Sequence, residues 1–157
     1  MLWTMGVPTE LAAAQIVKRN LKRIGLDVVI KGLPPPALFR KAVERNAAFD
    51  ISLGSWIADY IDPYQYTNAL FDSRFLGGSN IAHFDSPRFD GLMRSTAQLQ
   101  GAARYRAYGN LDVRLARDAA PMVAVSYDSQ ALLVSERVGC VLNRSGFFLD
   151  LPAVCLK

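Results

Sequence analysis

Two short stretches, LDVVIK at residues 26–31 and FDISLG at residues 49–54, decide the fold of this chain. The first is rich in β-branched residues and the second alternates between apolar and polar positions, so both are typical of β-strands. Between them, PPP at residues 34–36 ends the first strand, and residues 37–45 carry apolar side chains on one side of a helix. The sequence therefore predicts a strand, a helix and a second strand in succession.

A helix and a short apolar stretch precede this unit. Residues 2–5 are apolar, and residues 13–24 repeat apolar side chains at helical spacing. We expect Thr9 to cap the start of this helix and Gly25 to end it. Strands and helices that alternate in this way are typical of an open α/β sheet.

The rest of the chain is expected to hold mainly helices. Asp62 with Pro63, and Ser86 with Pro87, each combine a capping residue with a proline at the first helical position. A longer helix is expected at residues 102–119. Strands are expected in three places: residues 122–127, 132–134 and 138–142.

Length and composition indicate one globular domain. The chain has 157 residues, of which 51% are hydrophobic and 20% are charged, enough for a packed core. No apolar run reaches the roughly 18 residues of a membrane span. The first residues also lack the basic and apolar regions of a signal peptide. Either the protein is cytoplasmic or its beginning has been removed.

Negative charge gathers in the middle of a mildly basic chain. The net charge is +4, but residues 49–90 hold six acidic and two basic residues. Such a segment suits a cationic group better than a phosphate, and nucleic acid is not expected as a partner. In the alternative interpretation, these aspartates cap helices and turns.

The residues offer little for catalysis or metal binding. His83 is the only histidine, no glycine-rich phosphate motif occurs, and Cys140 and Cys155 stand alone. Asp59 and Asp62 are suited to acid–base work or to capping turns. We therefore expect no enzyme, no metal and no cofactor. The two cysteines either form a disulfide or are unrelated buried thiols.

A ligand site is expected where the strand at residues 49–54 ends. Ligands of open α/β sheets bind beyond the carboxyl ends of the strands, and the chain continues there through Trp56 and Asp59. An indole offers a flat apolar wall, and a carboxylate pairs with an ammonium group. Alternatively, Trp56 belongs to the core and Asp59 caps a turn.

Several of these segments together resemble a known family. AAQI at residues 13–16, LKRIGLDV at 21–28, FDI at 49–51 and WIADYIDP at 56–63 occur in this order, followed by NIAHF at 80–84, SPRFD at 86–90 and RYRAY at 104–108. The chain resembles the C-terminal lobe of family 5 extracellular solute-binding proteins, the oligopeptide- and dipeptide-binding subunits of ABC importers. The resemblance implies a periplasmic-binding-protein-like lobe with an open mixed sheet, a fragment of a two-lobed protein.

The resemblance also implies particular roles. Residues 1–138 would form the ligand-binding second lobe, and residues 139–157 would return toward a first lobe that this chain lacks. Asp59 would hold the α-amino group of a peptide, Trp56 would line a side-chain pocket, and Tyr60 would belong to the same site. Because the chain has one wall of the cleft, we expect weak or undetectable ligand binding.

The resemblance further implies an extracytoplasmic protein that captures peptides or other amine-bearing solutes. It would be lipid-anchored in its full length and would deliver its ligand to the permease subunits of an ABC transporter. The alternative is an intracellular regulatory or interaction module that reuses the fold. An oxidised Cys140–Cys155 pair favours import. Residues 146–151 are expected to be poorly anchored, held by that disulfide, or engaged in a dimer.

Overall fold

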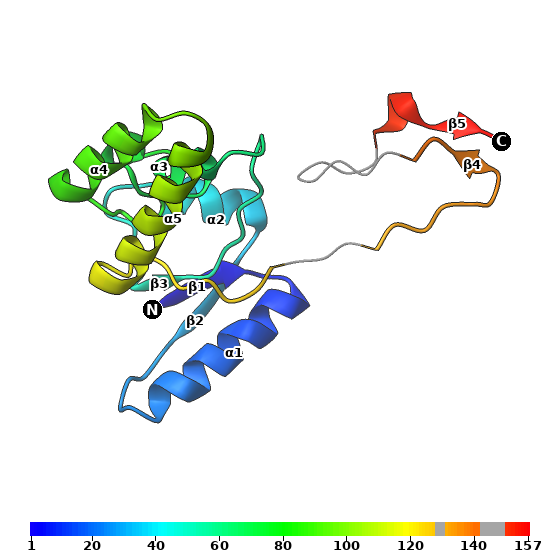
Figure 1. Cartoon of the computed structure of the whole chain (residues 1–157). Coiled ribbons are helices and arrows are strands. Elements are labelled where there is room, and N and C mark those ends of the chain that lie inside the picture. The colour runs from blue at the N-terminus through cyan, green and yellow to red at the C-terminus, as the bar shows by residue number, and fades with distance from the viewer. Residues whose placement is uncertain (128–130, 142–149) are drawn as a thin grey trace.

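A three-stranded parallel sheet forms one half of the folded body. The computed structural model describes residues 1–127, 131–141 and 150–157 (Figure 1). The central strand β1 (Leu2–Met5) pairs with β2 (Ile30–Leu33) on one side and with β3 (Ile51–Ser52) on the other, in the order β2-β1-β3. The α/β class expected from the sequence is confirmed, and every described pair of the main sheet is parallel.

Two helices cover opposite faces of this sheet, as Figure 1 shows. Helix α1 (Pro8–Lys22) packs on the face that carries Leu2, and helix α2 (Pro35–Ala42) packs on the face that carries Trp3. Neighbouring residues of a strand point to opposite faces, so the apolar pair Leu2-Trp3 supplies both cores.

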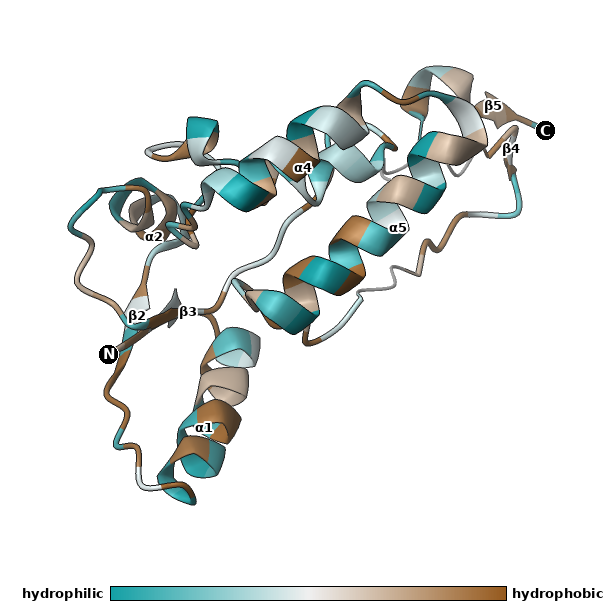
Figure 2. Ribbon diagram, turned by 60° about the vertical axis from the view of Figure 1, so that its left-hand side comes forward, coloured by the Kyte–Doolittle hydropathy of each residue, from teal (hydrophilic) through white to brown (hydrophobic). Residues whose placement is uncertain are grey.

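A helical half packs beside the sheet. It contains η1 (Pro63–Gln65), α3 (Asn68–Phe71), η2 (Ser73–Phe75), α4 (Pro87–Ala97) and α5 (Gly101–Asp118). Apolar and polar residues alternate along α5 (Figure 2), and its buried residues Tyr108, Leu111 and Leu115 recur at the spacing of an amphipathic helix. The shared core of this half comprises Leu70, Phe71, Phe89, Met93, Tyr108, Leu111 and Leu115.

The first helix ends where the sequence predicts and begins slightly earlier. Gly25 has φ +85°, the N–H of Leu26 donates to the carbonyl of Leu21 (3.1 Å), and the N–H of Gly25 donates to Lys22 (3.1 Å). This is a Schellman ending, which needs a left-handed residue. The predicted cap at Thr9 is wrong, because the helix starts at Pro8 and Val7 occupies the capping position.

The first predicted strand starts too early. Residues 26–29 carry the chain from the end of α1 to the sheet, and β2 begins at Ile30. The N–H of Leu2 bonds to the carbonyl of Val29 (2.8 Å), so β1 determines where pairing starts. β-Branched residues without an aligned neighbour do not form a strand.

The strands predicted at residues 122–127 and 132–134 are wrong. The described residues there form neither helix nor strand, and Val123 and Tyr127 are 79% and 94% exposed. These apolar stretches have no strand beside them within the described chain. Of the strand predicted at residues 138–142, Val138–Gly139 forms β4, and residue 142 lies outside the described residues.

A disulfide-linked hairpin forms the C-terminal end, set apart from the body in Figure 1. Strand β4 pairs antiparallel with β5 (Cys155–Leu156), and η3 (Leu151–Ala153) precedes β5. Cys140 and Cys155 are bonded, with their Cα atoms 5.3 Å apart, which confirms the disulfide alternative. Residues 146–149, part of the predicted end segment, lie outside the described residues, and Leu151 is exposed.

We expect replacement of both cysteines by serine to loosen this hairpin and to leave the body unchanged. Its ladder has two residue pairs, and an isolated pair of strands is marginal in water. The crosslink contributes roughly 3 kcal/mol in the chain-entropy model. Amide exchange at Lys157, whose N–H bonds to the carbonyl of Arg137 across the hairpin (2.9 Å), should become fast while the melting temperature of the helical signal stays constant. A melting temperature lowered by several degrees would contradict this separation.

Candidate functional site

The candidate site lies at the carboxyl edge of the parallel sheet. From β1 the chain crosses to β2 on one side, and from β2 it returns past β1 to β3 on the other. In open α/β sheets, ligands bind beyond the carboxyl ends of the strands at such a change of direction. After Ser52, the chain enters this region and runs without regular structure to η1. Trp56, Asp59 and Tyr60 all lie on this segment.

Trp56 has the core contacts that one of the two interpretations from the sequence expected. Its ring is half-buried and packs against the core of the helical half. Its indole Nε1 is buried and has no hydrogen-bond partner among the described residues. Buried donors are paired in the great majority of cases. The ring is therefore anchored by packing, while its one polar group lacks an acceptor.

Asp59 presents a free carboxylate. The residue is exposed, and its side chain makes no hydrogen bond or ion pair with any described residue. Its main-chain N–H donates to Oε1 of Gln65 (3.2 Å). Tyr60 beside it is 48% exposed. The carboxylate thus stands in solvent, three residues after the anchored indole.

Asp62 has a different role from Asp59, although the two share one motif. Its Oδ1 accepts from the N–H of Tyr64 (2.8 Å), so Asp62 caps η1, and Pro63 occupies the first position as predicted. Arg104 of α5 holds the same carboxylate with two hydrogen bonds, Nη2 to Oδ1 at 2.7 Å and Nε to Oδ2 at 3.3 Å. Burial opposes ionisation of this carboxyl group, but these hydrogen bonds and the charge of Arg104 outweigh it and lower the pKa of Asp62.

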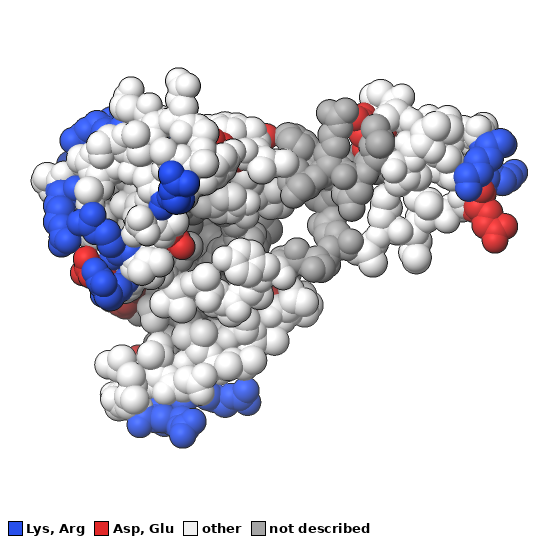
Figure 3. Space-filling model, in the orientation of Figure 1, with Lys and Arg blue, Asp and Glu red and all other residues white. Residues whose placement is uncertain are grey.

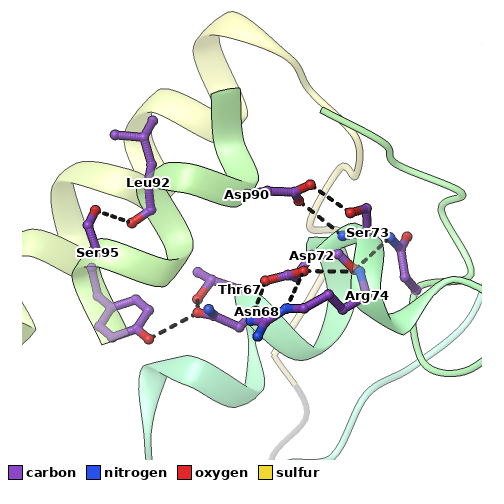
Figure 4. Close-up of polar contacts among 10 residues, drawn as sticks. Thr67, Asn68, Asp72, Ser73, Arg74, Asp90, Leu92 and Ser95 are labelled. Atoms are coloured by element: carbon purple, nitrogen blue, oxygen red, sulfur yellow. Dashed lines mark hydrogen bonds and ion pairs between the residues drawn. The ribbon is translucent and has the colours of Figure 1, made fainter. Parts of the chain in front are cut away.

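Two further aspartates of the acidic middle stabilise the helical half (Figure 4). Asp72 is fully buried, caps η2 through the N–H of Arg74 (3.0 Å), and forms a two-bond ion pair with the Arg74 guanidinium. Asp90 accepts from the N–H (3.0 Å) and the hydroxyl (2.6 Å) of Ser73. Burial works against the charge of Asp72, but the bonds from Arg74 prevail and lower the pKa. The capping interpretation is confirmed for Asp62 and Asp72.

We expect the free energy of unfolding to decrease as the pH drops below the ordinary carboxyl pKa of 3.8. The pKa values of Asp62 and Asp72 are lowered in the folded chain, so the unfolded chain binds protons first. Their contribution is complete above this value and is lost as the pH falls through the folded-state pKa values. Urea unfolding between about pH 6 and about pH 2.5 measures the effect. The Asp62→Asn variant should show a shallower dependence, and an equal dependence would contradict the assignment.

The structure adds residues that the sequence interpretation missed. Gln65 is buried, and Arg104 reaches Asp62 across 42 positions of the chain, so no local pattern links them to Asp59. Nε2 of His83, the only histidine, lies 2.6 Å from the carbonyl of Ala42, the last residue of α2. That geometry makes Nε2 the donor to a helix end.

Basic side chains gather in separate groups on the face of the molecule that Figure 3 shows. Figure 3 shows Lys and Arg over the outer surface of the helical half and at the end of α1. Arg19, Lys22 and Arg23 are exposed there, as expected for a solvated helix face. No helix in the described part of the chain is both long and apolar enough to cross a membrane.

Comparison with known proteins identifies the family. Residues 2–77 match the family described as bacterial extracellular solute-binding proteins, family 5 Middle. The periplasmic oligopeptide-binding protein OppA of Escherichia coli (strain K12) is 34% identical over 130 residues, which cover 82% of this chain and 22% of that protein. The chain belongs to family 5 of the bacterial extracellular solute-binding proteins.

Two other similar proteins agree in extent and in fold. The probable ABC transporter periplasmic-binding protein SapA of Escherichia coli (strain K12) is 27% identical over 138 residues, covering 82% of this chain and 25% of that protein. The structure of HbpA2 from Haemophilus parasuis superposes with a TM-score of 0.76 at 18% identity, covering 99% of this chain and 31% of that one. This likeness confirms the predicted fold. The chain spans about a quarter of the length of the curated relatives it matches.

Proposed function

We propose that this chain forms one wall of a solute-binding cleft that captures peptides or other amine-bearing solutes for an ABC importer. The observation that carries the proposal is the exposed carboxylate of Asp59, unpaired among the described residues, three residues after the anchored Trp56 on the segment that follows β3. The curated relative OppA is named as an oligopeptide-binding protein, which supports this class of ligand.

The chemistry of the two side chains fits a peptide amino terminus. A protonated amine makes a charge-assisted hydrogen bond with a carboxylate, which strengthens as the cleft excludes water. The half-buried indole ring of Trp56 offers an apolar surface for a side chain of the peptide. Tyr60 completes the polar edge with a half-exposed phenol.

The proposal includes a domain organisation and a location. Residues 1–138 act as the second lobe, residues 139–157 lead toward a first lobe of the same protein, and permease subunits receive the solute. The disulfide Cys140–Cys155 supports an extracytoplasmic location, because such bonds persist in oxidising compartments. It also favours import over an intracellular regulatory module. Curated relatives named as periplasmic binding proteins support the same location and a binding role without catalysis.

Peptide titration followed by NMR tests this function. The chain has two tryptophans, so its ¹H–¹⁵N spectrum should show two indole signals, and a Trp56→Phe variant assigns them. We expect millimolar tri- to pentapeptides to shift the Trp56 signal and to leave that of Trp3, which is 5% exposed beneath α2, unchanged. An unchanged Trp56 signal at these concentrations would refute the proposal.

A further inference from the structure

The segment that carries Asp59 has little main-chain support. Among residues 54–61, a single main-chain N–H donates a hydrogen bond. The flanking N–H groups are both bonded, that of Leu53 to the carbonyl of Trp3 and that of Asp62 to the carbonyl of Tyr60. The single donor among residues 54–61 is the N–H of Asp59, and its acceptor is a side chain, Oε1 of Gln65. The position of the candidate carboxylate therefore depends on where Gln65 lies.

Gln65 is well placed to hold this loop. It is the last residue of η1 and is 7% exposed, so its amide has little freedom to move. Asp62, which caps the start of η1, directly follows the loop, so both ends of this short helix are linked to the loop. A buried acceptor that bonds one loop N–H resists the loss of that bond, because an unpaired buried oxygen is costly.

Arg104 fixes η1 against the helical half. Besides its two bonds to Asp62, its Nη1 donates to the carbonyl of Ala97 (2.7 Å) at the end of α4, and its guanidinium lies 4.9 Å from the ring centre of Tyr108. The side chain is 18% exposed. One arginine thus joins α4, α5 and η1, and planar guanidinium groups are suited to such a junction.

We infer that Gln65 and Arg104 are positioning residues that hold the Asp59 carboxylate in its binding orientation. Arg104 fixes Asp62 and η1, and Gln65 at the end of η1 fixes the main chain at Asp59. Neither residue needs to touch the solute. This inference rests on the proposed function of Asp59.

Four variants separate positioning from general stability. Gln65→Met removes the acceptor at similar size, and Gln65→Glu restores an oxygen at the same place. Arg104→Met removes the clamp. Arg74→Met is its matched control, because Arg74 makes an equivalent two-bond pair with Asp72 at the start of η2 and no hydrogen bond to residues 54–61 of the described chain. The readouts are the ¹⁵N order parameters of residues 57–61 without ligand and the peptide titration of the Trp56 indole signal.

We expect Gln65→Met and Arg104→Met to lower the loop order parameters from about 0.85 to below about 0.6. Peptide binding should weaken about fivefold, the factor that one ordinary hydrogen bond supplies. Gln65→Glu should restore both properties, and Arg74→Met should change neither. The inference is overturned if the first two variants bind peptide as the wild type does, or if Arg74→Met weakens binding equally. If the wild type shows no peptide response, the proposed function fails, and the loop order parameters alone decide whether the two residues hold Asp59.

Discussion

Replacing Tyr108 by alanine should lower the free energy of unfolding by about 3–5 kcal/mol. Tyr108 is 2% exposed in the core of the helical half, where it packs among residues of α3, α4 and α5. Its removal leaves a cavity and also removes the surface on which Arg104 lies. Because the whole stability of such a domain is only about 5–15 kcal/mol, the variant should be partly unfolded at moderate temperature.

Tyr108→Phe is the matched control. It keeps the ring and removes one hydrogen bond, from the phenol to Oδ1 of Asn68 (3.0 Å). Oδ1 of Asn68 still accepts from the hydroxyl of Thr67 (3.1 Å), so no buried acceptor is left unpaired. We expect a loss of about 1 kcal/mol. Urea unfolding followed by circular dichroism measures both variants, and similar losses would show that the polar bond, not packing, dominates.

Replacing Asp72 by alanine should lower the free energy of unfolding by about 2–3 kcal/mol. The carboxylate is fully buried and accepts three hydrogen bonds from Arg74, one of which caps η2. Its removal leaves the N–H of Arg74 without an acceptor. The guanidinium is about half exposed and can turn to water, which limits the loss.

Asp85→Ala is the control for this effect. Asp85 is an exposed acidic residue of the same middle segment, and it makes no hydrogen bond or ion pair within the described chain. Its replacement should change stability by less than about 0.5 kcal/mol. Thermal unfolding of the two variants at neutral pH compares them. Equal changes would mean that Asp72 is no more important to the fold than a surface charge.

The parts of the fold that depend on local chemistry were predictable from the sequence. Gly25 ends α1 because a left-handed residue is needed there, and Asp62 with Pro63 begins η1 because that pair supplies a cap and a fixed φ. The long helix expected at residues 102–119 is α5, displaced by one residue. Alternating strands and helices then left few arrangements for the sheet.

Features that depend on distant neighbours were not predictable. Residues 122–127 have the composition of a strand, but no described strand lies beside them to complete it. At the site, the motif at residues 56–63 suggested one shared role for Asp59 and Asp62. The structure gives them different roles, because Arg104 bonds to the carboxylate of Asp62 and not to that of Asp59. The contact between Gln65 and Asp59 is likewise a product of the turn at η1, and a glutamine in an irregular segment gives no signal of it.

The central claim is that the Asp59 carboxylate binds a protonated amine, and matched peptides test it most directly. A tripeptide with a free amino terminus and the same peptide acetylated at that terminus should be titrated into the wild type and into Asp59→Asn, with the Trp56 indole signal as the reporter. We predict that the wild type binds the free peptide at least about tenfold more tightly, as expected for a charged pair of roughly 1.4 kcal/mol. Asp59→Asn should lose this preference. Equal affinity of the wild type for both peptides, or an unchanged preference in Asp59→Asn, would contradict the claim.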